Sequence, residues 1–257
     1  MKKLVPMIMV LTAIISTCLL LTQCSSRPKT QTLKFATEAT YAPFAFMQAN
    51  GQITGFGTDI VHAVCRQMRK KCELINAPFD SLIPSLQLGK YDALFGGLQI
   101  TPSRKKVVNF SHNYYDDTVT FVIKKQNNFT IDTAGLKDKI IGVQVGTTYA
   151  QYLQQKYGKE ITLKTYASDM NAFLDLKEGR IDAVFTDKPV GITWIKKQKS
   201  QQFITKGNII DHQLFGQGYG FAIRKGNTKL LHSINQALTT IKENGEYTKI
   251  VNKWFDH

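Results

Sequence analysis

Apolar and polar residues along the chain change between two periods, one typical of strands and one typical of helices. From residue 32 onward, short apolar runs alternate with segments whose apolar residues recur at helical spacing, such as Ile60, Val61, Val64 and Met68. The runs predict strands at residues 33–37, 73–77, 92–98, 139–145 and 221–225. Helices are predicted from Thr58 or Asp59, from Asp80 to Leu88 with Pro84 in the first turn, from Pro102, near residue 147, and from Lys229 to Asn244.

One sequence pattern occurs twice at matching points of this alternation. GKYDALF at residues 89–95 has a near-copy, GRIDAVF, at residues 179–185. Each copy follows a helix, enters an apolar strand, and precedes a polar turn and a helix with a proline near its start, at Pro102 or Pro189. Two βαβ half-units predict an α/β protein with mainly parallel sheets, whose ligands bind beyond the carboxyl ends of strands. Two such units facing each other would form one cleft.

The N-terminus has the pattern of an export signal. Lys2 and Lys3 precede an apolar stretch over residues 4–21, which is interrupted by polar residues and is followed by LTQC at residues 21–24. This pattern is typical of a cleaved secretory signal rather than a stable membrane span. Residues 21–24 resemble a bacterial lipobox, which would attach a lipid to Cys24, although Gln23 stands where a small residue is usual. The alternative is a soluble mature form.

The charge balance of the chain is compatible with several classes of partner and identifies none of them. There are 33 Lys and Arg against 19 Asp and Glu, a formal net charge of +14, which falls to +12 if residues 1–23 and their two lysines are removed. A basic balance is compatible with nucleic acid, an anionic membrane or an anionic polymer, or with a solvated surface alone. No nucleic-acid-binding motif occurs, and the five His have no metal-ligand spacing, so we expect no metal and no cofactor.

Two cysteines remain in the body of the chain, Cys65 and Cys72. Export would place them in an oxidising compartment, and the C-x6-C spacing does not fit zinc. A short-loop disulfide at the end of a helix is the simpler interpretation, with two buried free thiols as the alternative.

The order of strands and helices divides the chain into segments. We expect a signal peptide at residues 1–23, a tether at 24–31, a first lobe from residues 32–116 and 219–257, and a second lobe at 120–214. The hinge would lie at residues 116–120 and 214–219, where the second crossing is Gly-rich.

Several segments together resemble a known family. They are TEATYAPF at 37–44, GFGTD at 55–59, FDSLIPSL at 79–86, ITPSR at 100–104 and GVQVGT at 142–147. In this order the chain resembles the polar amino-acid family of periplasmic binding proteins that serve ABC importers, and within it the lysine/arginine/ornithine and arginine binders. The resemblance runs from about residue 32 to the C-terminus. It implies a two-lobed type II periplasmic-binding-protein fold, each lobe a mixed, mainly parallel sheet flanked by helices, joined by two crossover strands. It also implies a Cys65–Cys72 disulfide, a monomer, and a membrane permease as partner.

The resemblance and the chemistry agree on how the α-groups of an amino acid would be held. Arg104 lies in the first turn of the helix that Pro102 opens, where a guanidinium can bind a carboxylate through two hydrogen bonds. The family implies that Thr148 donates from the other lobe and that Asp187 pairs with the ammonium group. It also implies close approach of the backbone at two glycines that replace serines, Gly96 and Gly97.

The side chain of the ligand is assigned through the resemblance. It places Tyr41 and Phe79 on either side of that side chain, where aromatic faces suit a flat guanidinium or a methylene stem. Glu38 falls where binders of basic ligands have an acidic residue, usually Asp, so the preferred ligand length stays open. Gln99 replaces a small hydroxyl residue near the ammonium position. Taken singly, Arg104 could be an exposed helix-end cation, and the aromatics could belong to the core.

The leading hypothesis is an exported binding protein, not an enzyme, that delivers a basic amino acid to an ABC permease. Arginine is preferred because stacking together with a planar fork favours a guanidinium, while lysine, ornithine and histidine stay possible. The alternatives are a surface adhesin for anionic glycans and a periplasmic dehydratase-like enzyme on the same fold, for which Glu38 is the best acid–base candidate. The location would be the periplasm or cell envelope, with lipid attachment and surface exposure as further expectations.

Overall fold

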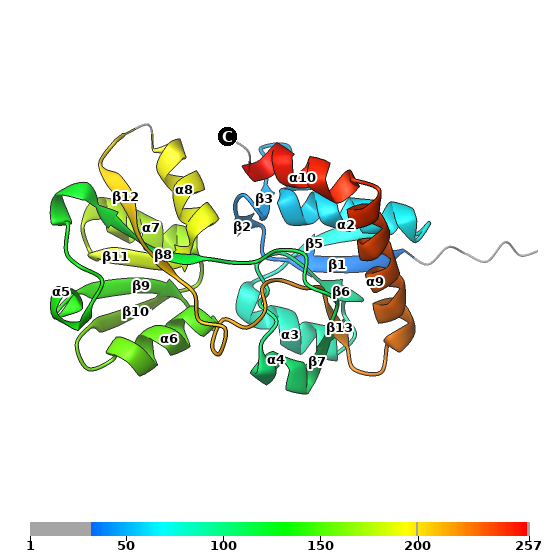
Figure 1. Cartoon of the computed structure of the whole chain (residues 1–257), viewed down its shortest axis with the longest axis horizontal. Coiled ribbons are helices and arrows are strands. Elements are labelled where there is room, and N and C mark those ends of the chain that lie inside the picture. Colours follow the sequence, from blue (N-terminus) through cyan, green and yellow to red (C-terminus); the bar gives the residue numbers. More distant parts are fainter. Residues whose placement is uncertain (1–31, 199, 256–257) are drawn as a thin grey trace, which may run out of the picture. The chain divides into compact units, whose positions relative to one another are not determined.

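The computed structural model describes residues 32–198 and 200–255, so the predicted signal peptide, the tether and Cys24 lie outside the described residues. The described chain forms two five-stranded sheets and one small three-stranded sheet (Figure 1). No helix of this part is long and apolar enough to cross a bilayer. We call the first large sheet with its helices lobe 1 and the second with its helices lobe 2.

The sheet of lobe 1 has the strand order β5-β1-β6-β13-β7. β1 pairs in parallel with both β5 and β6, whereas β13 runs antiparallel to β6 and to β7. The strands are β1 (Leu33–Thr37), β5 (Cys72–Asn76), β6 (Ala93–Leu94), β7 (Val108–Phe110) and β13 (Ala222–Arg224).

The sheet of lobe 2 repeats this order as β10-β9-β11-β8-β12. Again the first three strands are parallel, and the strand that enters from the other lobe, β8, is antiparallel to both of its neighbours. The strands are β8 (Val119–Lys124), β9 (Ile140–Gln144), β10 (Thr162–Tyr166), β11 (Ala183–Asp187) and β12 (Phe203–Ile209). The chain therefore crosses between the lobes twice, after β7 and after β12.

Helices cover both faces of each sheet (Figure 1). Adjacent strand residues separate the two faces: Phe35 packs with Ile60 and Leu238, whereas Ala36 packs with Leu82. The helices of lobe 1 are α2 (Phe56–Gln67), α3 (Phe79–Gln87), α4 (Pro102–Val107), α9 (Thr228–Glu243) and α10 (Glu246–Phe255). Those of lobe 2 are η1 (Lys125–Asn127), α5 (Thr133–Leu136), α6 (Thr148–Tyr157), α7 (Asp169–Glu178) and α8 (Lys188–Lys197).

The start of α2 differs from the prediction. The sequence favoured a cap at Thr58 or Asp59, but the helix begins at Phe56, directly after Gly55. Its first N–H groups are satisfied by the chain rather than by a side chain, because Phe56 N and Gly57 N donate to backbone carbonyls of residues 43 and 44, each at 2.8 Å. Gly55 has φ 132°, and a Cβ there would lie 2.4 Å from the carbonyl oxygen of residue 44.

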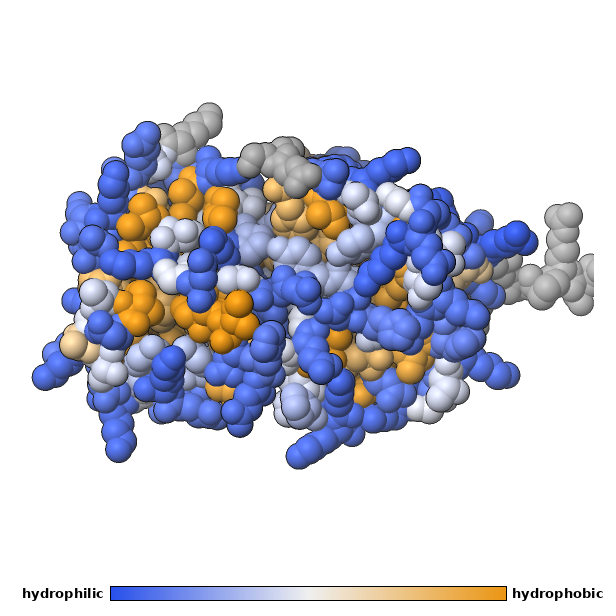
Figure 2. Space-filling view, viewed as in Figure 1, coloured by the Kyte–Doolittle hydropathy of each residue, from blue (hydrophilic) through white to orange (hydrophobic). Residues whose placement is uncertain are grey.

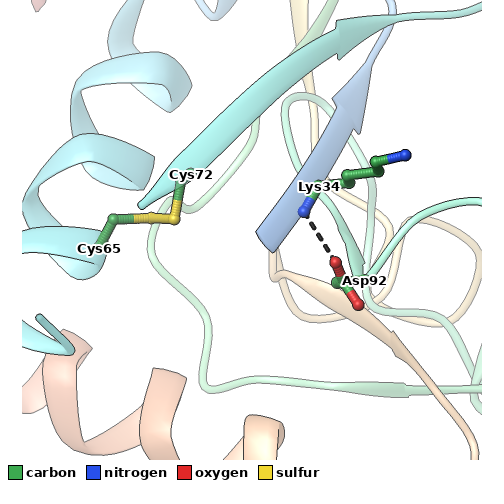
Figure 3. The surroundings of a disulfide bond; sticks show 4 residues. All are labelled: Lys34, Cys65, Cys72 and Asp92. Atoms are coloured by element: carbon green, nitrogen blue, oxygen red, sulfur yellow. Dashed lines mark hydrogen bonds between the residues drawn. A yellow bond between two sulfur atoms is a disulfide. The ribbon is translucent and has the colours of Figure 1, made fainter. Parts of the chain in front are cut away.

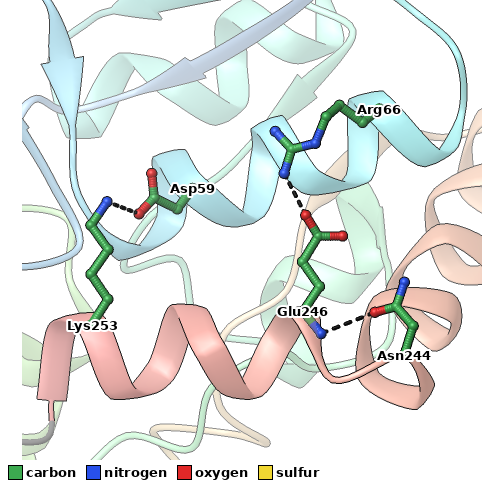
Figure 4. Close-up of polar contacts among 5 residues, drawn as sticks. All are labelled: Asp59, Arg66, Asn244, Glu246 and Lys253. Carbon is green, nitrogen blue, oxygen red and sulfur yellow. Dashed lines mark hydrogen bonds and ion pairs between the residues drawn. The ribbon is translucent and has the colours of Figure 1, made fainter.

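Asp59 is instead used in a contact that the sequence did not predict, the packing of α10 on α2. Its Oδ2 accepts from Lys253 Nζ and from Trp254 Nε1, each at 2.7 Å. Two turns later in α2 and two turns earlier in α10, Arg66 pairs with Glu246 (Figure 4). α10 and the small sheet of β2 (Thr40–Tyr41), β3 (Ala45–Met47) and β4 (Ile53–Thr54) were both absent from the prediction.

Two further differences concern lobe 1. Pro84 lies inside α3 rather than in its first turn, because the helix begins at Phe79. The strand predicted over residues 92–98 is only two residues long. After Phe95, whose N–H still donates to Ala36 O at 3.0 Å, Gly96 adopts φ 102° and the chain leaves the sheet.

The disulfide that the sequence favoured is present. Cys65 near the end of α2 is bonded to Cys72 at the start of β5 (Figure 3). The bond closes the turn over residues 66–71.

Candidate functional site

The two large sheets point the carboxyl ends of their parallel strands at one pocket, which has an empty volume of about 410 Å³ including the space open to solvent. Residues from both lobes form it: Thr37, Glu38, Tyr41, Phe79, Leu82, Phe95, Gly97, Gln99 and Arg104 from lobe 1, and Gln144, Thr147 and Tyr149 from lobe 2. Six of the nine predicted ligand-binding residues are in this lining. Gly96, Thr148 and Asp187 are not. Thr148 and Asp187 bond to the lining residues Gln99 and Tyr149, whereas Gly96 bonds to Tyr114.

Arg104 is held by the start of α4. Thr101 caps the helix by accepting from Arg104 N, and Pro102 occupies its first turn, as the sequence predicted. The side chain is 9% exposed, its guanidinium carbon lies 5.5 Å from the centre of the Phe79 ring, and Nη1 donates to Gln99 O at 3.1 Å. Burial lowers the pKa of Arg104 to about 10, so the group stays cationic at neutral pH. It can donate to a carboxylate in the pocket.

Asp187 is the last residue of β11 and is fully buried. It precedes α8 but makes no capping hydrogen bond, since its oxygens accept from Tyr149 OH at 2.6 Å and from Tyr41 OH. Burial, with a smaller contribution from the charge of Asp117, raises the pKa of Asp187 to about 7. Burial therefore disfavours the ionised form of Asp187, which an ammonium partner would stabilise.

Tyr41 reaches across from lobe 1 to Asp187 in lobe 2, and Gly97 makes room for its ring. A Cβ at Gly97 would lie 2.7 Å from Tyr41 Cε1, closer than side-chain contacts allow. The glycine thus allows an aromatic ring to pack on the backbone at the carboxyl end of β6.

Gly96 has a different role from its neighbour. Its N–H donates to Tyr114 OH at 3.1 Å, and that hydroxyl donates back to Gly96 O at 2.8 Å. The Gly96 N–H that the resemblance assigned to the ligand is therefore already bonded to Tyr114. Only the second lone pair of the Gly96 carbonyl is left for a ligand.

Gln99 connects the two lobes next to Asp187. Its amide nitrogen donates to Asp117 Oδ2 at 2.6 Å and to Tyr149 OH at 2.9 Å, and its oxygen accepts from Thr148. Thr148 and Tyr149 open α6, which Thr147 caps. The Thr148 hydroxyl, which was predicted to donate to the ligand, donates here to Gln99, and Gln99 lines the pocket.

Glu38 follows β1 and faces a lobe 2 residue that the sequence analysis did not select. Gln144 Nε2 donates to Glu38 Oε2 at 2.7 Å and to Ala167 O at 3.0 Å. Burial raises the pKa of Glu38. Gln144 is the last residue of β9 and lies at the cleft end of the strand predicted over residues 139–145. This position at a strand end was a usable signal for a ligand contact.

Asp169 was also missed. It opens α7, is 4% exposed, and accepts a hydrogen bond from Thr186. Burial raises its pKa to about 7, and the charge of Glu38 adds to the shift. Nothing local in the sequence distinguishes it from an ordinary helix-start acid.

The cleft thus gathers buried carboxyl groups from both lobes around one buried guanidinium. Among the described residues, every ion pair lies elsewhere on the surface, namely Arg66–Glu246, Lys164–Asp175, Arg180–Asp175 and Lys253–Asp59. The same part of the chain has no cluster of three His, Cys, Asp or Glu placed to hold a metal ion. Two lobes of this topology, joined by two crossings and enclosing a polar pocket, define a type II periplasmic binding protein.

Comparison with known proteins identifies the family. The chain belongs to the bacterial extracellular solute-binding proteins, family 3, whose family model matches residues 33–257. It is 43% identical to ABC transporter arginine-binding protein 1 of Escherichia coli (strain K12) over 223 residues. This alignment covers 87% of this chain and 90% of that protein. It is 44% identical over 217 residues to the arginine-binding periplasmic protein of Mannheimia haemolytica, covering 84% and 88%.

The fold agrees with a solved structure of this kind. A Salmonella typhimurium periplasmic binding protein described as having high arginine specificity superimposes with a TM-score of 0.82 at 40% identity, covering 88% of this chain and 99% of that one. The predicted fold class is therefore confirmed.

Proposed function

We propose that the protein captures a free basic amino acid outside the cytoplasm, with L-arginine as the preferred ligand, and delivers it to an ABC-type permease. The α-carboxylate would bind Arg104, and the α-ammonium would bind Asp187. The guanidinium would reach Glu38, between the aromatic rings of Tyr41 and Phe79.

The observation that carries this proposal is a pair of buried ionisable side chains at one cleft: Arg104 lines it from lobe 1, and Asp187 of lobe 2 is bonded to the lining residues Tyr41 and Tyr149. Arg104 of lobe 1 and Asp187 of lobe 2 take part in none of the ion pairs among the described residues. A buried charge is costly unless it is paired, and a zwitterionic amino acid supplies both missing partners at once. Because the ligand would touch both lobes, binding would favour closure about the predicted hinge segments.

Arginine is supported by the far end of the pocket. Glu38 and Gln144 are turned toward each other there, and Gln144 uses its amide hydrogens on Glu38 and Ala167 O. Its own Oε1 takes part in neither of these hydrogen bonds and can accept one. Two acceptors from opposite lobes suit the planar fork of a guanidinium better than a single ammonium. The names of the arginine-binding relatives support the same ligand.

The test is isothermal titration of protein that has been unfolded, stripped of bound ligand and refolded. We expect one-to-one binding of arginine, weaker binding of lysine, ornithine and histidine, and loss of binding in Arg104→Ala and Asp187→Ala. Glu38→Gln should weaken arginine more than it weakens histidine, because it removes a charge only at the distal end. Absence of heat with all four amino acids would overturn the proposal.

We further propose that the protein has no catalytic activity, since the curated relatives are named as transport proteins. Bound ligand should be recovered chemically unchanged after prolonged incubation. Consumption of the ligand would favour a dehydratase-like enzyme, and salt-sensitive glycan binding that ignores Arg104 would favour an adhesin. Attachment through a lipid on Cys24 stays part of the proposal, to be tested by mass spectrometry of the mature protein.

A further inference from the structure

The edge of the lobe 1 sheet opposite the cleft collects basic side chains from several separate segments. β1, β5 and β6 begin at this edge, because Leu33 pairs with Cys72, and Phe35 with Ala93. β13 ends there, since it runs antiparallel to β6. The exposed basic residues next to these strand ends, which we call the basic edge, are Arg69, Lys70, Lys71, Lys90, Arg224 and Lys225.

These charges are not neutralised within the described chain. None of the six takes part in an ion pair of the described residues. Only two acidic residues lie close by in sequence, fewer than the six cations. One is Asp92, whose Oδ2 accepts from Lys34 N at 2.8 Å (Figure 3). The other is the exposed Glu73 of β5. The basic edge therefore presents a net positive charge to solvent.

The corresponding edge of lobe 2 also has lysines but balances more of its charge. Arg180 there is paired with Asp175. Lys137, Lys159 and Lys177 adjoin acidic residues in the sequence, at positions 138, 160 and 178. The basic edge of lobe 1 is thus a feature of one lobe and not simply the average charge of the protein.

The turn at the centre of the basic edge is held in place. The disulfide closes residues 65–72, and Leu33 N donates to Lys71 O at 2.9 Å. Arg69 has φ 53°, which reverses the chain between α2 and β5. Three consecutive cations are therefore displayed on a fixed turn, with little backbone entropy to lose on binding.

The chain also enters lobe 1 at this edge. Leu33 starts β1 beside the turn, so the segment that precedes Thr32 joins the body here, whereas the cleft lies at the opposite ends of the same strands. The eight residue-to-residue steps from Cys24 to Thr32 can span at most about 28 Å when fully extended. A membrane attachment near Cys24 would therefore keep the basic edge close to lipid headgroups.

We propose that the basic edge is a docking surface for anionic lipid headgroups of the membrane. Clustered Lys and Arg attract anionic lipids through long-range charge, and no shaped pocket is needed. In the space-filling view, the face around this end of lobe 1 is mostly hydrophilic, which fits contact with headgroups rather than insertion (Figure 2). This inference does not depend on which amino acid the cleft binds.

The test measures binding of the full-length protein to vesicles of phosphatidylcholine, with or without phosphatidylglycerol. One variant changes Lys70, Lys71, Lys90 and Lys225 to Gln. A matched control changes Lys125, Lys137, Lys159 and Lys177 to Gln, the same loss of four charges from exposed lysines of lobe 2. Any membrane binding by the N-terminal segment is common to all three proteins and is measured on pure phosphatidylcholine.

We expect the first variant to lose at least tenfold in affinity for the anionic vesicles, and the control to lose less than threefold. Raising the salt from 50 to 300 mM should weaken the wild type to a similar extent. Equal losses in both variants would overturn the proposal, because generic charge would then suffice, and so would no loss in either. If the first variant loses heparin binding but keeps vesicle binding, the partner is an anionic glycan and the lipid proposal is wrong. Circular dichroism melting confirms that both variants fold.

Discussion

The repeated motif can be compared strand by strand between the two lobes. At its beginning the two copies are almost the same in structure. Gly89 and Gly179 have φ of 74° and 77° and end helices α3 and α7. The residue after each glycine donates to a carbonyl five positions back, at 3.0 Å in Lys90 and 2.9 Å in Arg180. This is the pattern of a helix that stops at a left-handed glycine.

The aspartate of each copy also does the same thing. Asp92 Oδ2 accepts from Lys34 N, and Asp182 Oδ2 accepts from Ile140 N, both at 2.8 Å. In each lobe the carboxylate thus satisfies an N–H at the start of the neighbouring parallel strand, that of the second residue of β1 and of the first residue of β9. The motif is therefore a structural device for starting a strand beside its neighbour.

The copies differ most where they reach the cleft. After Phe95 the first copy continues as Gly96 and Gly97, which allow Tyr114 and Tyr41 to approach the backbone. After Phe185 the second continues as Thr186 and Asp187, which bring polar groups into the same cleft. The end of the motif that starts the strand is retained for folding, and the end at the cleft has become specialised for the ligand.

The largest expected effect distinguishes Asp182, inside the second copy, from Asp187, two residues beyond its end. Asp187→Asn should weaken arginine binding at least a hundredfold, because it removes the charge opposite the ammonium. Asp182→Asn should leave the affinity within about twofold and lower the free energy of unfolding by about 1–2 kcal/mol, since only a part-buried hydrogen bond to Ile140 N is altered. Titration calorimetry and urea unfolding measure the two effects. Equal affinity in both variants would contradict the proposed role of Asp187.

The disulfide marks a second difference between the lobes. Replacing Cys65 and Cys72 by Ser should lower the free energy of unfolding by about 2–3 kcal/mol, the chain-entropy value for a loop of this size. The affinity for arginine should not change, because the bond lies at the edge away from the cleft. The control is the wild type with reductant, which should unfold at the same denaturant concentration as the double variant.

Acidification should act on the cleft end of the second copy. The pKa of Asp187 is about 7, above its unfolded value, so the folded state without ligand prefers the neutral form and is destabilised as pH rises from about 4 through 7. An ammonium ligand requires the ionised form, so arginine affinity should rise about tenfold between pH 6 and pH 8, with release of protons. Calorimetry in two buffers of different ionisation enthalpy measures that release, and Asp187→Asn should abolish most of it. A flat profile in the wild type would contradict this assignment.

The smallest expected effect tests whether the strand-starting ends are equivalent. Gly89→Ala and Gly179→Ala should each cost about 1 kcal/mol of stability, because a Cβ disfavours the left-handed conformation that both require. Neither should alter arginine affinity. Urea unfolding measures the loss of stability in each single variant. A difference above about 1 kcal/mol between the two losses would show that the strand-starting ends are not equivalent.

The sequence by itself determined the features that depend on near neighbours. The alternation of periods, the repeat, the cap at Thr101 with Pro102, and the placement of Arg104 in a first helical turn were all readable. So was the pairing of Cys65 with Cys72, through spacing and compartment. Each of these is decided by a few consecutive residues, whose conformational preferences do not require the rest of the fold.

The tertiary structure alone decided where distant segments meet. The carbonyls of residues 43 and 44 accept from the first N–H groups of α2, so the helix begins before Asp59. The Asp59 carboxylate instead accepts from Lys253 of α10. Asp169 was brought near Glu38 from the other lobe, and its raised pKa exists only because packing excludes water there. Hydrogen bonds and desolvation depend on what lies opposite in space, and sequence order does not record this across two crossings.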